Sequence, residues 1–142
     1  MSKTIGVVGM GYVGLTLTAA LARAGNVVYG VDVQPAVRES LARGRPLIFE
    51  PGVEEVFEAM GGSTIFIDAE LPAEGLDAAV ICVSTPIDEA THQPNLANLA
   101  AAARDIARWC GPETVVVVRS TVPIGASRAV VLPPLLEAWG RV

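Results

Sequence analysis

The chain has 142 residues, of which 51% are hydrophobic and 18% charged, and its formal net charge is −5 at pH 7. This length suits a single domain with a real core, and the composition excludes a disordered tail. The negative charge argues against a nucleic-acid partner, and no apolar run reaches the ~20 residues of a membrane span. Because the N-terminus lacks a signal-peptide pattern, we expect a cytoplasmic protein.

The chain is organised around residues 3–33. The apolar run Lys3–Val8 predicts a strand, and apolar residues at helical spacing over Val13–Ala24 predict a helix. A second apolar run, Val27–Val33, predicts another strand, which carries one acid, Asp32, near its end. The order is therefore strand, glycine-rich turn, helix, strand and acid.

Each glycine of the turn has a predicted physical role. Gly9 permits a sharp turn out of the strand, Gly11 leaves room for a pyrophosphate, and Gly14 lets the helix lie close to the sheet. Asp32 follows Gly14 by 18 residues, close to the spacing of an acid that binds ribose hydroxyls. The residue after it is Val33, with no arginine to meet a 2′-phosphate. The pattern predicts binding of NAD rather than NADP, with a purely structural glycine turn as the alternative.

The rest of the chain continues the alternation of helices and strands. Helices are predicted at Pro35–Arg43, Val53–Met60 and Leu96–Cys110, and strands at Thr64–Ile67, Ala78–Val83 and Thr114–Val118. A last helix is predicted from near Ala126, broken or kinked at Pro133-Pro134, with a second piece at Leu135–Trp139. Asn95 is a predicted helix cap, and His92 is interpreted as a solvated residue of a polar loop.

Five strands alternating with helices predict an α/β fold with a Rossmann-type, doubly wound parallel sheet in the order 3-2-1-4-5. The complete fold has a sixth strand, and the chain stops at Val142, where that strand would begin. We therefore expect residues 1–142 to be a dinucleotide-binding domain whose sixth strand and substrate domains lie outside this chain. The high hydropathy fits a sheet buried on both faces, or apolar surface that belongs against a partner.

The two cysteines, Cys82 and Cys110, lie in apolar surroundings and are interpreted as reduced core residues rather than a disulfide. Cys82 is placed in the middle of a strand, so we expect an inert thiol rather than a nucleophile. With a single histidine and no close spacing of these residues, no metal site is predicted.

Five segments in a fixed order resemble the N-terminal domain of the UDP-glucose/GDP-mannose dehydrogenases. They are Gly9–Leu15, Asp32, Glu50-Pro51-Gly52, Val83–Pro86 and Ser120–Gly125. From Ile87 through the helix that follows Asn95, the chain is most similar to UDP-N-acetylmannosamine dehydrogenases. Members of this family oxidise the C6 alcohol of a sugar to the acid with two NAD molecules, through a thioester on a cysteine, and the resemblance implies a UDP-sugar as the substrate. The resemblance implies a homodimeric enzyme of polysaccharide biosynthesis whose cysteine and sugar site lie in later domains.

The resemblance also implies roles for individual residues. Backbone groups of Tyr12 and Val13 would meet the pyrophosphate, and Asp32 would bind the adenosine ribose. Thr85 would lie along the cofactor, while Thr121 would lie near the nicotinamide and position the catalytic water. This chain alone is expected to bind NAD without dehydrogenase activity.

The chain departs from the family pattern at three places. Arg119 stands where these enzymes often carry an acid, and Val37 where many carry a basic residue that Arg38 could replace. Pro133-Pro134 interrupts a helix that is usually continuous. Two alternatives remain: a stand-alone NAD or nucleotide-sensing module, and the NAD domain of a 3-hydroxyisobutyrate-type dehydrogenase, against which Ser120–Pro123 speaks.

Overall fold

The chain folds into alternating strands and helices, and the computed structural model describes residues 1–73 and 75–140. The strands are β1 (Thr4–Val8), β2 (Val27–Val31), β3 (Ile65–Asp68), β4 (Ala78–Ile81) and β5 (Val115–Val118). The helices are α1 (Tyr12–Arg23), α2 (Pro35–Ala42), α3 (Val53–Met60), α4 (Ala97–Trp109) and α5 (Leu132–Ala138), with a π-helical stretch at Ser127–Val131 before α5. All predicted elements are present, although β2 and β4 each end two residues earlier than predicted.

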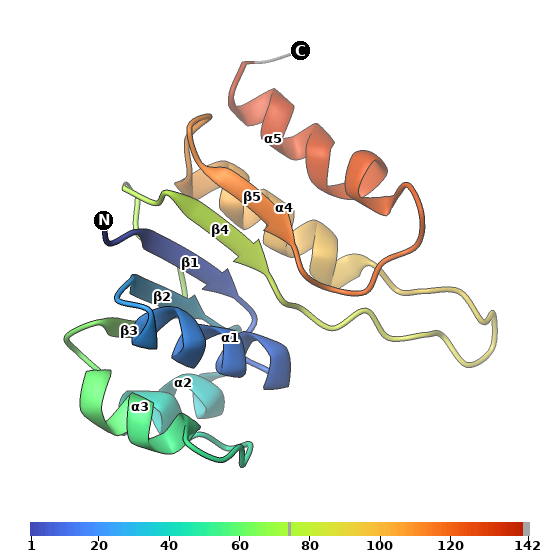
Figure 1. The fold of residues 1–142 in the computed structure, drawn as a ribbon. Coiled ribbons are helices and arrows are strands. Elements are labelled where there is room, and N and C mark those ends of the chain that lie inside the picture. Colours follow the sequence, from blue (N-terminus) through green and yellow to red (C-terminus); the bar gives the residue numbers. More distant parts are fainter. Residues whose placement is uncertain (74, 141–142) are drawn as a thin grey trace.

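The strands form one parallel sheet in the order β3-β2-β1-β4-β5, which confirms the predicted Rossmann-type topology (Figure 1). Strand β1 lies at the centre and pairs with β2 and β4. Val8 is in register with Val31 on one side and Ile81 on the other, so the carboxyl ends of these strands lie level. The connections reverse direction at β1 and β4, which is where sheets of this kind bind ligands.

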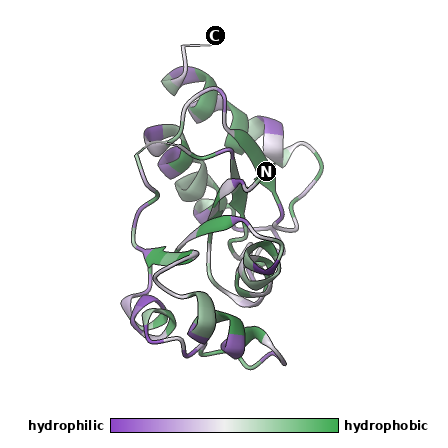
Figure 2. Cartoon of the chain, turned by 60° about the vertical axis from the view of Figure 1, so that its left-hand side comes forward, coloured by the Kyte–Doolittle hydropathy of each residue, from purple (hydrophilic) through white to green (hydrophobic). Residues whose placement is uncertain are grey.

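Apolar side chains on both faces of the sheet form two cores. On one face, Val7 and Val28 pack with residues of α1 and α3, including Leu15 and Phe57. The second core is built on the opposite face from strand residues and from α4 and α5. Figure 2 shows that the strands are mostly hydrophobic, while the helices mix hydrophobic and hydrophilic residues. Within the described part of the chain, no helix is both long and apolar enough to cross a bilayer.

Strand β5 forms one edge of the sheet and is buried on one face only. Val116 and Val118 pack against the second core, whereas Val115 is 60% and Val117 is 40% exposed. Of the two explanations of the high hydropathy, burial on both faces therefore does not hold for this edge strand. Part of the high hydropathy therefore belongs to exposed apolar surface.

The last helical segment differs from the prediction in one respect. Ser127–Val131 is a π-helical stretch in which the N–H of Leu132 bonds to the carbonyl of Ser127, five residues back. Helix α5 then begins at Leu132, not at Leu135 as predicted, and the two prolines lie in its first turn. A first turn tolerates proline because its N–H groups have no partner inside the helix. The predicted break at the prolines is therefore wrong, because residues 126–138 are helical without a gap and only the helix type changes, before the prolines.

Candidate functional site

A cavity of about 340 Å³ opens at the carboxyl ends of β1, β2 and β4. It is bounded by the glycine turn, by the loop that begins with Asp32, by the residues after β4 and by one face of α4. Its lining residues are Val8, Gly9, Gly11, Val31, Asp32, Val33, Gln34, Ala69, Cys82, Val83, Ser84, Asn98, Ala101, Ala102 and Asp105. Three of the predicted site residues, Gly9, Gly11 and Asp32, therefore share one cavity.

Two glycines of the turn are required by the fold itself. Gly9 has φ +95°, a conformation that other residues rarely adopt, and a Cβ there would lie 2.8 Å from the carbonyl oxygen of Cys82. A Cβ on Gly14 would press on the carbonyl oxygen of Gly9, far inside the 3.0 Å that real Cβ atoms keep. Gly14 thus allows α1 to approach the turn closely.

Gly11 has a different role, because neither its backbone nor its neighbours require glycine. Its φ of −70° and ψ of −168° suit any residue, and a Cβ there would meet no protein atom within 4 Å. The side chain that is missing at Gly11 would therefore project into open space beside the cavity. That open space is what a ligand needs if it is to reach the backbone, so the turn fits a pyrophosphate.

The amino end of α1 adds backbone donors to this space. No side chain caps the helix, and its first turn contains no acidic residue. Tyr12 and Val13 are the first two helical residues, and N–H groups in a first turn have no acceptor within the helix. Such an end attracts an anion through its free N–H groups and through the helix dipole.

Asp32 connects the glycine turn to the end of β2. Its Oδ2 accepts a hydrogen bond from the N–H of Met10 at 2.9 Å, and its Oδ1 accepts one from the N–H of Gln34 at 2.9 Å. The side chain is half-buried and lines the cavity. Each carboxylate oxygen has a further lone pair, so Asp32 can still accept hydrogen bonds from ribose hydroxyls.

The residues near Asp32 show what stands at Val37, where many members of the family carry a basic residue. Val37 is half-buried and packs against the first core, so it is a packing residue of α2. Arg38 instead approaches the end of β2, where its Nη1 donates to the carbonyl oxygen of Asp32 at 2.7 Å. A positive charge is therefore present beside Asp32, supplied by the neighbour of Val37.

Thr85 and Thr121 are brought together although they lie on different loops. The hydroxyl of Thr85 donates to the carbonyl oxygen of Thr121 at 2.7 Å, and the hydroxyl of Ser120 donates to the carbonyl oxygen of Val83 at 2.7 Å. These two bonds join the loop after β4 to the loop after β5. Neither threonine lines the cavity around Gly11, and their roles toward the cofactor stay predictions.

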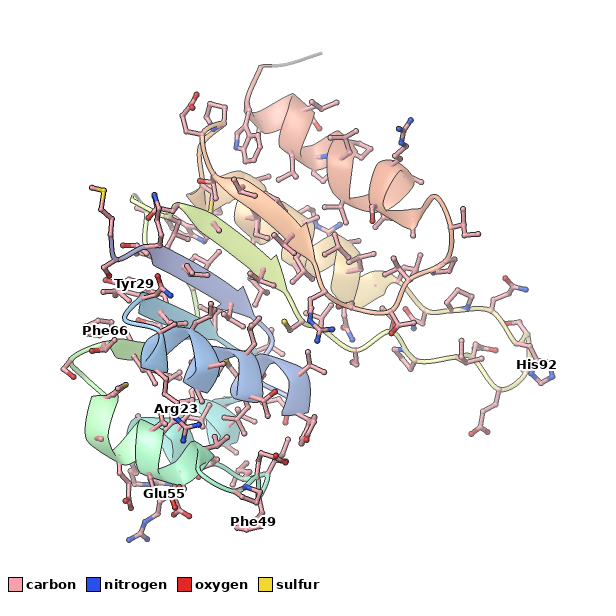
Figure 3. The ribbon with its side chains drawn as sticks, in the orientation of Figure 1. Arg23, Tyr29, Phe49, Glu55, Phe66 and His92 are labelled. Carbon is pink, nitrogen blue, oxygen red and sulfur yellow. The ribbon has the colours of Figure 1, made fainter. Side chains whose placement is uncertain are left out.

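The Glu50-Pro51-Gly52 segment also contacts the site. The phenol of Tyr12 donates to Oε2 of Glu50 at 2.9 Å, and this carboxylate raises the pKa of Tyr12. The loop that carries Glu50 exposes apolar side chains, with Phe49 84% exposed (Figure 3).

His92 lies at the far end of the loop after β4 and is exposed, in agreement with its interpretation as a solvated residue.

Three polar residues that line the cavity were not predicted from the sequence. Asn98 of α4 donates from Nδ2 to the carbonyl oxygen of Ser84 at 3.2 Å and to its Oγ at 3.1 Å, so it holds the loop after β4. Ser84, Asn98 and Asp105 all line the cavity. The available signal was the spacing of seven residues between Asn98 and Asp105, which places them on one face of a helix. The cap residue of α4 is Leu96, one position after the predicted Asn95, although Oδ1 of Asn95 accepts from the N–H of Ala97 at 3.0 Å.

Cys82 lies just beyond the end of β4 and lines the cavity, so its predicted position in the middle of a strand is wrong. The N–H of Cys82 still donates to the carbonyl oxygen of Val8 at 2.8 Å, so this residue makes the last backbone bond between this segment and β1. Both cysteines are free, and Cys82 is buried. Burial raises the pKa of the Cys82 thiol to about 11, and the positive charge of Arg119 only partly opposes this effect. In the described residues, no group of three or more His, Cys, Asp or Glu side chains could hold a metal ion.

Cys82 is therefore expected to react slowly with iodoacetamide at pH 8. With a pKa of about 11, only about one thiol in a thousand is ionised at that pH. Because this pKa is higher in the folded chain than its ordinary value of 9.0, folding stability should fall as the pH rises from about 9 to 11. Alkylation followed by mass spectrometry in a Cys110→Ala background measures the pKa directly. A midpoint below pH 9 would contradict the prediction.

The parallel sheet, the glycine turn that opens α1 and the acid at the end of β2 define a Rossmann-type dinucleotide-binding domain. More specifically, the chain belongs to the UDP-glucose/GDP-mannose dehydrogenase family, whose NAD binding domain matches residues 3–139. The match excludes the 3-hydroxyisobutyrate-type alternative. NAD is the cofactor of this domain.

Several known proteins are similar to this chain. UDP-N-acetyl-D-mannosamine dehydrogenase of Yersinia pestis is 35% identical over 126 residues, which cover 88% of this chain and 29% of that protein. The structure of a UDP-glucose dehydrogenase from Pyrobaculum islandicum aligns with a TM-score of 0.87 and 34% identity, over 100% of this chain and 34% of that one. A UDP-N-acetyl-mannosamine dehydrogenase from Staphylococcus aureus aligns with a TM-score of 0.86 and 26% identity, over 94% and 32%. The chain thus spans about a third of the length of these relatives.

Proposed function

We propose that the chain is the NAD-binding domain of a nucleotide-sugar 6-dehydrogenase, which oxidises a UDP-sugar to a UDP-uronic acid. The observation that carries the proposal is the open space at Gly11 next to Asp32, in a chain of this family. The names of the most similar curated relatives favour UDP-N-acetylmannosamine as the sugar nucleotide. The sugar site, the reactive cysteine and a homodimer contact would belong to other domains of a longer enzyme.

Different residues of this chain would bind different parts of the cofactor. The N–H groups of Tyr12 and Val13 would bind the pyrophosphate, and Asp32 the adenosine ribose. Thr85 would lie along the cofactor, and Thr121 would lie near the nicotinamide and position water. When bound, NAD supplies a hydride acceptor. Because the sugar and the cysteine must be brought to this end of the cofactor, we propose that residues 1–142 alone have no dehydrogenase activity.

Two further features support a cytoplasmic protein that uses NAD. Cys82 and Cys110 are both free thiols, which suits a reducing compartment. Val33, directly after Asp32, is 85% exposed and offers no charge to a 2′-phosphate. Arg38 is the cation near this position. Its guanidinium is already hydrogen-bonded to the carbonyl oxygen of Asp32.

Activity measurements on two proteins test the proposal. The product of the complete gene should form NADH, followed at 340 nm, with UDP-N-acetylmannosamine and NAD, and residues 1–142 alone should form none. If the gene encodes only this chain and the chain binds NAD, the alternative of an NAD-sensing module is supported. NADH formation by residues 1–142 would overturn the proposed division between domains.

Asp32→Ala is expected to weaken NAD binding by about 1–3 kcal/mol, since it removes a charged acceptor of hydrogen bonds from the cavity. Calorimetric titration with NAD, with NADP beside it, measures the change. Asp68→Ala is the matched control, because Asp68 ends the neighbouring strand β3 in register with Val31 and lies outside the cavity. An Asp32→Ala variant that binds NAD like the wild type, while remaining folded by circular dichroism, would refute this role.

A further inference from the structure

The cavity continues past Asp32 to a stripe of side chains on α4. Asn98, Ala101 and Asp105 occur at helical spacing on the face of α4 that lines it. Ala69, which follows β3, belongs to the same lining. The alanines are small, so the cavity keeps room for a flat group between the end of β3 and the helix.

The polar side chains of the cavity differ in what they already bind. Asp32 accepts from two backbone N–H groups, and Asn98 donates to Ser84. Asp105 is exposed, lines the cavity and forms no hydrogen bond or ion pair with any residue that the structure describes. An ionised carboxylate only accepts hydrogen bonds, so Asp105 presents an unused acceptor to whatever fills this end of the cavity.

The fold determines which part of a dinucleotide lies there. The pyrophosphate lies at the glycine turn, and the acid at the end of β2 binds the ribose of the adenosine half. The base attached to that ribose must therefore continue into the cavity beyond Asp32, away from Gly11. Besides the glycine turn and Asp32, the lining offers apolar side chains such as Val33 and Val83, together with Ala69 and the α4 stripe that ends at Asp105.

We propose that Asp105 is a specificity-determining residue for the adenine base and accepts a hydrogen bond from its exocyclic amine. Hypoxanthine carries a keto oxygen in place of that amine, so its dinucleotide would bring an acceptor toward the carboxylate. The site should therefore favour NAD over nicotinamide hypoxanthine dinucleotide. This inference rests on the proposed NAD site and adds a residue that recognises the adenine base.

Calorimetric titration of residues 1–142 with the two dinucleotides tests the inference. The wild type should bind NAD about tenfold more tightly than the hypoxanthine dinucleotide, as expected for a hydrogen bond to a charged group. Asp105→Ala should lose affinity for NAD while its affinity for the hypoxanthine form stays the same or improves. Asp105→Asn should bind both forms within about twofold, because its amide can donate as well as accept.

The control is Glu55→Gln on α3, which removes one negative charge from an exposed position outside the cavity (Figure 3). It should keep the wild-type preference for NAD. Equal binding of both dinucleotides by the wild type, or an equal loss for both in Asp105→Ala, would overturn the role of Asp105 and leave NAD binding intact. Failure of the wild type to bind either dinucleotide would overturn the cofactor site as well.

Discussion

Gly14→Ala is expected to destabilise the chain by more than about 4 kcal/mol, enough to unfold many domains of this size. In most helices the exchange of glycine for alanine stabilises by about 1 kcal/mol. Here the sign reverses, because the new methyl group would overlap the carbonyl oxygen of Gly9, a backbone atom that cannot move aside alone. Urea unfolding followed by circular dichroism measures the change.

Gly111→Ala is the matched control for this prediction. Gly111 has no positive φ, and a Cβ there would meet no atom within 4 Å. The control should change the free energy of unfolding by less than about 0.5 kcal/mol. A Gly14→Ala protein as stable as the wild type would show that α1 can move away from the turn, against the close approach seen in the structure.

Gly11→Val is expected to reduce NAD affinity on the order of a hundredfold while the chain stays folded. Valine can adopt the backbone angles of Gly11, and the structure has open space for its side chain. That space is where the pyrophosphate must approach the backbone, so the branched side chain would exclude it. Gly11→Ala should have a smaller effect in the same direction, because it adds only one methyl group.

Calorimetric titration with NAD and thermal unfolding should be measured on the same samples. Gly111→Val is the control, since it adds the same side chain at a site away from the cavity. The melting temperature of Gly11→Val should fall by only a few degrees, as expected for a helix-end substitution of about 1 kcal/mol. Unchanged NAD affinity in Gly11→Val would mean that the pyrophosphate does not lie against this turn.

Together the two substitutions separate glycines that serve the fold from the glycine that serves the ligand. Gly14 lies against a backbone oxygen, whereas Gly11 lies against nothing. The position of each glycine in the motif predicted these two different roles. Their surroundings agree with these roles and identify the backbone oxygen of Gly9 as the atom that a side chain at position 14 would overlap.

The sequence by itself determined the architecture. Short continuous apolar runs and apolar stripes at helical spacing predicted every strand and helix, and their alternation predicted the parallel sheet and its order. The glycine turn and Asp32 predicted the cavity at the end of β1, because local backbone chemistry decides where a chain can turn and where an anion can approach. Gly9, Gly11 and Asp32 do line that cavity.

The tertiary structure decided how those elements contact one another. Asp32 bonds to Met10 across 22 residues of sequence, and Thr85 bonds to Thr121 across 36. Asp105 lines the site only because α4 packs against β4, next to the cavity. Strand β5 lies at the edge of the sheet, and Val115 and Val117 leave one of its faces exposed. Hydropathy and spacing predict the secondary structure of a segment and which of its faces is apolar. Contacts between residues far apart in the sequence depend on how the helices and strands pack.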